Sequence, residues 1–426
     1  MDIEKFHKIF LNSNGLITDS RKIVEGSIFL ALKGEKYDGH DFILEALEKG
    51  AKYAISEKNF NNEKVIKVEN TLNFLQKLAT HHRHYCDTKI IALTGSNGKT
   101  TTKELIKQVL SKKYNTYATE GNLNNHIGVP LTLLKLNKSY DFAVVEMGMS
   151  NFGEIKKLCE ITRPDFGIIT NIGKAHLENV GSIEGVAKAK GELYEYLYYN
   201  NKIIFVNERN QLLINILPKN YNKTVFYNNK IVNGKILENN IFLKVKLLFE
   251  GKEYQVNTKL YGEYNLDNII TAAFIGYYFN ISPEEICDAI ATYKPENYRS
   301  QFIETKLNKV IMDAYNANPT SMIASISSFL NLSCSNKVLI LGTMYELGDY
   351  EKEEHRKIIE LLTNYEVKSF FVGKGFKNIA IEKENFLYFE NTDELIEYLN
   401  KNKIDSSLIL IKGSRANQLE KILPFV

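Results

Sequence analysis

The feature that most restricts the fold is a series of short, almost continuously apolar segments that alternate with helix-like stretches from residue 89 onward. These segments are IIALT, FAVVEM, DFGIITN and KIIFVN. Apolar residues at nearly every position, rather than at every second one, indicate parallel strands buried on both faces. The sequence therefore predicts a doubly wound, mostly parallel α/β sheet, in which ligands bind beyond the carboxyl ends of the strands.

Different patterns flank this central region. Before it, short strand-like runs such as SIFLAL and one helix, DFILEALEKGA, predict a small α/β domain; after it, VLILG, SFFVG and LILIKG predict a Rossmann-like α/β unit. The 426 residues fit three domains of about 150 residues each. We place the domains at 1–88, 89–298 and 299–426, and we expect residues 222–261 to form a hairpin insertion that turns near Gly251.

Composition narrows the class of protein. The net charge is only +3 and the basic residues are spread along the chain, so we expect no nucleic-acid partner. The four cysteines show no CxxC spacing, which is typical of free thiols in a reducing compartment. The start, MDIEKFHKIF, lacks the apolar core of a signal peptide, and no segment approaches the ~18 apolar residues of a membrane span. We therefore expect a cytoplasmic protein without a membrane span.

A glycine-rich turn joins the first apolar segment to a helix-like stretch in TGSNGKTT, residues 94–101. Gly95 and Gly98 let the chain curl so that the N–H groups of the helix N-terminus can face phosphate oxygens. Lys99 can reach the terminal phosphates, and the hydroxyl of Thr100 can bind magnesium. The familiar phosphate loop has four residues between its glycine and Gly-Lys, whereas this loop has two. An ordinary strand-to-helix turn is the weaker alternative, because Lys-Thr directly follows glycine.

Polar residues at other strand ends are candidates for the same site. Glu146 ends FAVVEM, where a carboxylate needs a partner, and magnesium prefers such hard oxygen ligands. The alternative for Glu146 is a salt bridge at the strand end. Asn268 and Asp313 can bind a base and a ribose, although a helix-capping Asn and a turn Asp are the favoured explanations of the two residues taken alone. HHRHY at 81–85 allows a metal site, but a polar helix end is the favoured interpretation.

Two lysines in one predicted helix differ in their surroundings. At helical spacing, Lys190 shares an apolar face with Val186, Leu193, Tyr194 and Leu197. Lys188 lies on the other face, where we expect surface pairs with Glu184, Glu192 and Glu195. A buried lysine has a lowered pKa and is a nucleophilic amine that can capture carbon dioxide as a carbamate. The alternative for Lys190 is a lysine whose ammonium group reaches the surface along its own aliphatic chain.

Together these motifs resemble those of the Mur ligase family, over essentially the whole chain. DSRKIVEGSIFLALKGEKYDGHDF is similar to the family's uridine-nucleotide domain, and TGSNGKTT is similar to its shortened phosphate loop. GNLNNHIGVPLTLL, VVEMGMSNFGEI, VAKAKGE, DAYNANPTSM, ELGDYEKEEH and KGSRANQLE follow in family order. YNANP resembles the members that add D-alanyl-D-alanine, whereas members that add the third peptide residue resemble YAHTPD there.

The resemblance implies an ATP-dependent amide ligase of peptidoglycan precursor synthesis. Its implied substrates are UDP-N-acetylmuramoyl-tripeptide and D-Ala-D-Ala, joined through an acyl phosphate. Its implied cofactors are ATP and two Mg²⁺ ions, with Lys190 carbamylated, and we expect a monomer. Whether the third peptide residue is lysine or diaminopimelate stays open.

The resemblance also assigns roles to individual residues, and four of them, Lys99, Glu146, His176 and Lys190, are implied to be catalytic. The ATP phosphates would be held by Gly95, Ser96, Asn97, Gly98, Lys99, Thr100 and Thr101. The rest of ATP would be contacted by Asn268, Arg299 and Asp313. Magnesium would be bound by Thr100, Glu146, His176 and Lys190. The UDP substrate would be bound by Ser20, Arg21, Asn124 and Asn125, and the dipeptide would be bound by Tyr315, Asn316 and Asn318.

The chain departs from the family pattern at three positions. Tyr264 stands where His is usual and is left out of the predicted site, Arg299 lies in NYRSQ rather than after glycine, and Thr343 replaces a common Asp. One alternative function is another Mur-type amide ligase, such as folylpolyglutamate synthase, against which the uridine-domain resemblance and DAYNANP argue. The other is a nucleotide-binding regulatory module without ligase activity, against which Glu146, His176 and Lys190 argue.

Overall fold

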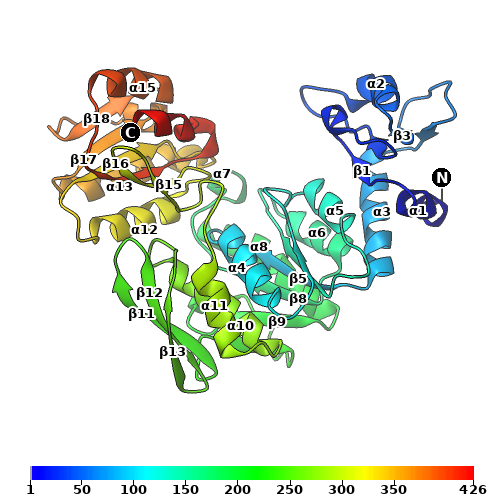
Figure 1. Cartoon of the computed structure of the whole chain (residues 1–426), viewed down its shortest axis with the longest axis horizontal. Helices are drawn as coiled ribbons and strands as arrows, with labels where there is room; N and C mark the ends of the chain where they lie inside the picture. Colours follow the sequence, from blue (N-terminus) through cyan, green and yellow to red (C-terminus); the bar gives the residue numbers. More distant parts are fainter. Residues whose placement is uncertain (1) are drawn as a thin grey trace.

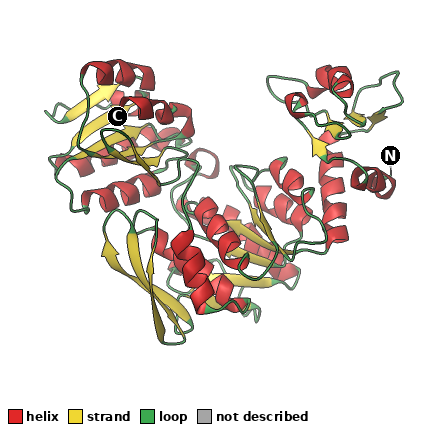
Figure 2. Cartoon of the chain, viewed as in Figure 1, coloured by secondary structure: helices red, strands yellow, loops and turns green. Residues whose placement is uncertain are grey.

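The computed structural model describes residues 2–426. Figure 1 shows three bodies arranged along the chain, with the N-terminal body lying well apart from the C-terminal one. The strands of the described residues form four sheets. As Figure 2 shows, helices cover the sheets of the central and C-terminal bodies, whereas a three-stranded sheet projects beside them. The structure therefore confirms the predicted α/β class with parallel sheets.

The N-terminal body contains a small parallel sheet in the order β1-β2-β3-β4. Its elements are α1 (Ile3–Leu11), β1 (Leu16–Ile17), β2 (Ile28–Leu30), α2 (Ile43–Glu48), β3 (Tyr53–Ser56), β4 (Val65–Lys67) and α3 (Thr71–Cys86).

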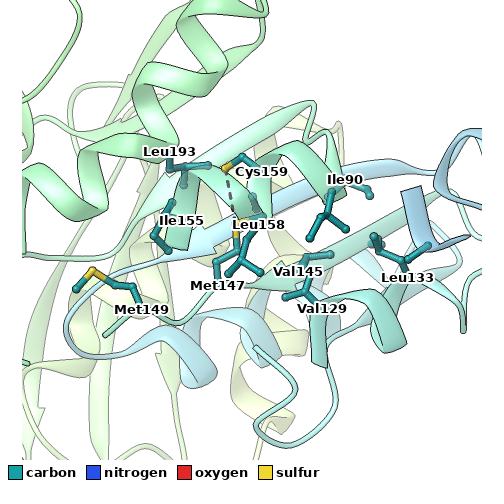
Figure 3. Close-up of a cluster of buried hydrophobic side chains, with 14 of the residues drawn as sticks. Ile90, Val129, Leu133, Val145, Met147, Met149, Ile155, Leu158, Cys159 and Leu193 are labelled. Atoms are coloured by element: carbon teal, nitrogen blue, oxygen red, sulfur yellow. Dashed lines mark hydrogen bonds between the residues drawn. The ribbon is translucent and has the colours of Figure 1, made fainter. Parts of the chain in front are cut away.

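Helix α3 packs into the core of the central body. Its buried residues Phe74, Leu75 and Leu78 belong to the same apolar cluster as Leu133 and Leu158. Figure 3 shows part of this cluster, with Leu133, Leu158 and Cys159 drawn beside Val145 and with Met147, which follows directly after β7 (Phe142–Glu146). The N-terminal body is thus anchored to the central body by this helix.

HHRHY forms the last turns of α3, as expected, but two of its polar side chains are not at the surface. His82 and Arg83 are buried. His82 donates a hydrogen bond from Nε2 to the Leu136 carbonyl (2.8 Å), so its Nδ1 accepts from His7 Nε2 of α1 (2.9 Å). Arg83 pairs with Asp165 (2.9 Å). These polar side chains therefore join α1 and α3 to the central body.

The central body has a six-stranded parallel sheet in the order β10-β9-β8-β5-β7-β6. Its strands are β5 (Lys89–Thr94), β6 (Thr116–Ala118), β7 (Phe142–Glu146), β8 (Phe166–Ile169), β9 (Ile203–Asn207) and β10 (Thr224–Tyr227). The four predicted strands are all present, and the short edge strands β6 and β10 are additional. The phosphate loop follows β5 in the middle of the sheet. The next strands in the chain, β6 and β7, lie on one side of β5, and β8, β9 and β10 lie on its other side. This is the position at which ligands bind in doubly wound sheets.

Helices cover both faces of this sheet. α4 (Lys99–Leu110), α10 (Asn265–Tyr278) and α11 (Pro283–Thr292) contribute to one apolar cluster, whereas α5 (Gly128–Leu133), α6 (Glu154–Thr162) and α8 (Ile183–Tyr199) contribute to the other. α7 (Leu177–Val180) and α9 (Gln211–Asn215) are short connecting helices. α11 begins with the expected Ser282–Glu285 capping box and Pro283.

The predicted insertion is shorter than expected. The antiparallel sheet consists of β11 (Val232–Asn239), β12 (Leu243–Phe249) and β13 (Lys252–Asn257), and it turns at Gly251 with φ +86°. β10 lies outside it because it pairs in parallel with β9. The insertion therefore begins after the last strand of the central sheet.

The C-terminal body has a sheet in the order β14-β15-β19-β16-β17-β18, in which only the edge strand β14 is antiparallel. Its strands are β14 (Gln301–Glu304), β15 (Lys309–Asp313), β16 (Lys337–Gly342), β17 (Lys368–Val372), β18 (Phe386–Phe389) and β19 (Leu408–Lys412). Its helices are α12 (Pro319–Leu330), α13 (Glu351–Thr363), α14 (Lys374–Lys377) and α15 (Thr392–Lys401). None of the helices within residues 2–426 is long and apolar enough to cross a lipid bilayer.

Candidate active site

The phosphate loop requires glycine at both predicted positions. Gly95 has φ +152° and Gly98 has φ +77°. A Cβ atom would lie 1.8 Å from Thr170 Oγ1 at Gly95 and 2.5 Å from Asn268 Oδ1 at Gly98. Neither position has room for a side chain, and the left-handed backbone adds to the cost of any other residue.

Lys99, the first residue of α4, closes this loop on itself. Its Nζ donates to the carbonyl oxygen of Gly95 (2.6 Å). Burial lowers the pKa of Lys99, which the negative charge of Glu146 partly counteracts. A lysine held among backbone carbonyls is well placed to exchange one of those contacts for a phosphate oxygen.

Glu146 is buried at the carboxyl end of β7, with only 1% of its surface exposed. It accepts hydrogen bonds from Thr100 Oγ1 (2.9 Å) and from Asn124 Nδ2 (2.9 Å). Among residues 2–426 no cationic side chain forms an ion pair with Glu146, so only neutral groups donate hydrogen bonds to its carboxylate. The alternative of a salt bridge at the strand end is therefore wrong. A carboxylate and a hydroxyl this close together are the hard oxygen donors that fit magnesium.

The loop after β8, which we call the coupling loop (residues 171–176), lies against the phosphate loop. Asn171 accepts from the Asn97 N–H through Oδ1 (2.9 Å), and its carbonyl accepts from the Ser96 N–H (3.0 Å). Ser96 Oγ accepts from the Gly173 N–H (2.9 Å). The conformation of the phosphate loop therefore depends on the position of the coupling loop.

The C-terminal body contributes residues to the same site. The Arg299 guanidinium stacks on the Tyr315 ring, 3.6 Å from its centroid. Asp313 accepts from Lys412 Nζ (2.5 Å) and from the Ser300 N–H (3.2 Å). Lys412 and Ser300 thus hold the carboxylate of Asp313, and Tyr315 holds the guanidinium of Arg299.

Arg299 lies in a linker with unusual backbone. Asn297, Tyr298 and Ser300 all have left-handed φ angles of 53–58° although none is glycine. Each such residue costs of order 1–3 kcal/mol, and strain of this kind clusters at ligand-binding and switch regions.

His176 and Lys190, the two further residues expected at the metal, have different surroundings. His176 Nδ1 lies 2.6 Å from Glu346 Oε2 of the C-terminal body, and the imidazole lowers the pKa of Glu346. Lys190 is 1% exposed, and burial together with the positive charge of Lys99 holds its pKa well below the usual value. Among residues 2–426, no three His, Cys, Asp or Glu side chains are grouped so that they can hold one metal ion. An ammonium at Lys190 does not fit a cation site, whereas a carbamate does.

The helical register that distinguishes Lys190 from Lys188 is confirmed. Val186, Lys190, Leu193, Tyr194 and Leu197 are all buried, whereas Lys188 is exposed. The expected surface pairs of Lys188 are wrong, because its Nζ lies over the Phe152 ring. Glu192 instead accepts from the Gly153 and Lys156 N–H groups at the start of α6.

Most of the predicted residues line one cavity of about 910 Å³. They come from the phosphate loop, from the loop before α5 and from both sides of the boundary between the central and C-terminal bodies. The predicted residues that line it are Ser96, Asn97, Gly98, Lys99, Thr100, Thr101, Asn124, Asn125, Glu146, His176, Asn268, Arg299, Asp313, Tyr315, Asn316 and Asn318.

Four predicted residues do not line this cavity. Gly95 belongs to the phosphate loop but does not line the cavity, and Lys190 is buried in α8. Ser20 and Arg21 lie on the N-terminal body, where the Arg21 side chain is 84% exposed and pairs with Asp19 (2.8 Å). The described conformation therefore separates the two halves of the expected UDP-substrate site.

Sequence reasoning missed several residues of the cavity wall. Tyr264, which was left out of the predicted site, lines the cavity, and its hydroxyl is hydrogen-bonded to Ser300 Oγ (2.9 Å). Lys412 also lines the cavity and was missed. It directly follows the apolar strand segment LILI, and the same position at the end of an apolar strand had identified Glu146 and Asp313 as candidates. Thr343 is buried away from the cavity, where its hydroxyl approaches the Val372 carbonyl (3.3 Å).

Comparison with known proteins places this geometry in a family. Three family models match successive parts of the chain: "Mur ligase family, catalytic domain" at residues 13–83, "Mur ligase middle domain" at 93–276 and "Mur ligase, glutamate ligase domain" at 298–415. The chain belongs to the Mur ligase family. The resemblance inferred from the motifs is thereby confirmed.

Individual Mur ligases align with nearly the whole chain. The UDP-N-acetylmuramoyl-tripeptide–D-alanyl-D-alanine ligase of Bacillus subtilis is 35% identical, and the alignment covers 96% of this chain and 92% of that protein. The Escherichia coli protein of the same name is 32% identical, with 96% and 93% coverage.

Solved Mur ligase structures match the architecture as well. A crystal structure of MurF from Acinetobacter baumannii has a TM-score of 0.88 at 29% identity and covers 99% of this chain and 97% of that one. MurF from Thermotoga maritima in complex with ADP has a TM-score of 0.86 at 27% identity, with 98% and 97% coverage. Folylpolyglutamate synthase from Mycobacterium tuberculosis, at 13% identity and a TM-score of 0.64, shares the fold alone.

Proposed function

We propose that this Mur ligase joins D-alanyl-D-alanine to UDP-N-acetylmuramoyl-tripeptide with the consumption of ATP, in the cytoplasmic synthesis of peptidoglycan precursors. One observation carries the proposal: a single cavity brings together the phosphate loop, Asn124 and the segment Tyr315–Asn318. These are the places at which ATP, the UDP substrate and the dipeptide are expected. The names of relatives that align over the whole chain support the same reaction.

The chemistry follows from the poor leaving group of a carboxylate. An oxygen of the tripeptide carboxylate attacks the γ-phosphorus of ATP, ADP leaves, and an acyl phosphate forms. The dipeptide amine then attacks the acyl carbon, loses a proton, and the C–O bond to phosphate breaks. Lys99 offsets negative charge that develops on the phosphoryl oxygens, while the loop N–H groups position them. Arg299 and Asp313 orient the nucleotide from the C-terminal side.

Thr100 and Glu146 would hold one magnesium ion, because they offer adjacent oxygen donors and Glu146 lacks a cationic partner. The ion would neutralise charge on the phosphates and orient them for transfer. We propose His176 and a carbamylated Lys190 as ligands for a second ion. The burial of Lys190, which lowers its pKa and favours the neutral amine, supports the carbamate, since a neutral amine reacts with carbon dioxide and an ammonium does not.

The three domains 1–88, 89–298 and 299–426 would each bring one ligand to the reaction. Ser20 and Arg21 are too far from the cavity to line it in this conformation, so the N-terminal domain would approach when substrate binds. Closure would also exclude water, which otherwise hydrolyses an acyl phosphate. We expect a monomer that becomes more compact, by small-angle scattering, with an ATP analogue and UDP-tripeptide; unchanged dimensions at saturation would contradict closure.

Phosphate release tests the reaction directly. ATP, Mg²⁺, the UDP-tripeptide and D-Ala-D-Ala should together support release, and omission of any one should abolish it. Release with a folate and glutamate instead would indicate folylpolyglutamate synthase activity. Slow release that depends on ATP alone would indicate a regulatory module. Tripeptides that end in lysine or diaminopimelate, tested in parallel, identify the natural substrate.

A further inference from the structure

The coupling loop, residues 171–176, contacts two different bodies with its two sides. One side holds the phosphate loop through Asn171 and Gly173, as described above. On the other side, the Lys174 N–H donates to Thr320 Oγ1 (3.1 Å) of α12. Lys174 Nζ pairs with Glu354 Oε1 (2.6 Å) of α13. A displacement of the C-terminal body is therefore expected to move the coupling loop and, through it, the phosphate loop.

Glu354 is an unusual partner for a contact between bodies. It is 2% exposed, and it accepts from two lysines: Lys174 across the boundary and Lys357 (2.9 Å) one turn along its own helix. The lysine side chains are similarly exposed, at 34% and 40%. A buried carboxylate that keeps one cationic partner avoids the large cost of an unpaired buried charge.

We propose that Lys174 is a positioning residue, which docks the C-terminal body through Glu354 and thereby holds the phosphate loop in its nucleotide-binding shape. Lys174 does not line the cavity, so it acts through the coupling loop and not on a ligand. The docked C-terminal body carries Arg299 and Asp313, which line the cavity from their side. This inference rests on the proposed use of the cavity for ATP.

The two lysines on Glu354 provide a matched pair of variants. Lys174→Met and Lys357→Met each remove one lysine and leave Glu354 with the other. Only Lys174→Met removes a contact across the boundary. Because a smaller docked fraction lowers the apparent affinity, Lys174→Met should raise the dissociation constant of a non-hydrolysable ATP analogue with Mg²⁺ by about 5-fold or more. Lys357→Met should change it by less than about 2-fold, as expected of a partly exposed pair within one helix.

Calorimetry measures the affinity, and small-angle scattering measures whether Lys174→Met enlarges the chain. Lys174→Arg, which keeps the charge, should restore both. Equal effects of Lys174→Met and Lys357→Met, small or large, would overturn the proposal, as would failure of Lys174→Arg to restore binding. This test does not depend on ligation. A chain that binds the analogue but releases no phosphate would refute the proposed function, and the affinities of the Lys174→Met and Lys357→Met variants could still be compared.

Discussion

Asn318, at the start of α12, donates a hydrogen bond from Nδ2 to Asn97 Oδ1 in the phosphate loop (2.8 Å). The same Asn318 side chain accepts from the Ser321 N–H through Oδ1 (2.9 Å), so it also caps its own helix. One side chain therefore joins the C-terminal body to the loop expected to bind phosphate, and its two functions can be separated by substitution.

Asn318→Asp should separate them. Aspartate caps a helix as well as asparagine does, so thermal stability should stay near that of the wild type. The donor to Asn97 is lost, and a negative charge is placed near the phosphates. The KM for ATP should therefore rise by roughly 2- to 10-fold, the range of one lost hydrogen bond. Asn318→Ala serves as the comparison, because it should also lose about 1 kcal/mol of stability. An unchanged KM in Asn318→Asp would show that the contact has no part in binding.

Lys99→Ala should abolish ligation without unfolding the chain. Its ammonium contacts only loop carbonyls in the described structure, so the fold loses little. Loss of one preorganised contact to the transition state costs on the order of 10²–10³ in kcat. Rates of phosphate release, with circular dichroism as the check on folding, measure the effect. Lys107→Ala, in the last turn of the same helix, is the control, and near-wild-type turnover in folded Lys99→Ala would refute the assignment.

Lys190→Ala should be inactive, and short carboxylic acids that replace the carbamate should restore part of the activity. Burial disfavours the ammonium, so the amine is available to carbon dioxide. Lys188→Ala, on the exposed face of the same helix, should stay active. An inactive and unrescued Lys190→Ala, together with a high-resolution map that shows a bare amine in the presence of bicarbonate, would leave Lys190 as a structural residue.

Acid should weaken the packing of α1 and α3. Burial and the neighbouring His82 lower the pKa of His7 to about 4. Between that value and the ordinary value near 6.5, the unfolded chain binds a proton that the folded chain does not. The free energy of unfolding therefore falls as the pH falls through this window, by on the order of 1–3 kcal/mol.

The variant His7→Gln tests this assignment, because glutamine can still donate to His82 but does not titrate. The loss in thermal midpoint between pH 7.5 and pH 5 should be smaller in His7→Gln than in the wild type. His126→Gln, at an exposed position, should behave like the wild type. Equal losses in all three proteins would show that the contact between His7 and His82 does not titrate.

The sequence predicted those parts of the fold that depend on local pattern. Nearly continuous apolar runs identified β5, β7, β8 and β9, and helical spacing separated Lys190 from Lys188. β6 and β10 were missed because they are short edge strands of three and four residues, whose polar positions give no clear period. The contact between Lys412 and Asp313 depends on β15 and β19 being neighbours although they are far apart in the chain, which no local pattern reveals.

The predicted site residues lie together at the strand ends of the central sheet and lie apart in the N-terminal body, for a related reason. Motif residues at strand ends converge because parallel strands end at the same edge of the sheet. Ser20 and Arg21 lie on a separate body, so their distance from the cavity depends on how the domains are placed. The placement of the N-terminal body depends on contacts such as the one between Arg83 and Asp165, and paired charges on remote segments carry no sequence signal.

Helix α3 lies between β4 and β5 in the chain, yet its apolar side chains pack in the same cluster as Leu133 and Leu158 of the central body. Limited proteolysis should therefore trim the N-terminal body only as far as the loop before Thr71 and should leave α3 attached to the rest. A fragment that begins at residue 89 would expose the apolar surface that Phe74, Leu75 and Leu78 cover, and would be prone to aggregation. One that begins near residue 70 would keep that surface covered and offers a way to study nucleotide binding apart from the rest of the N-terminal body.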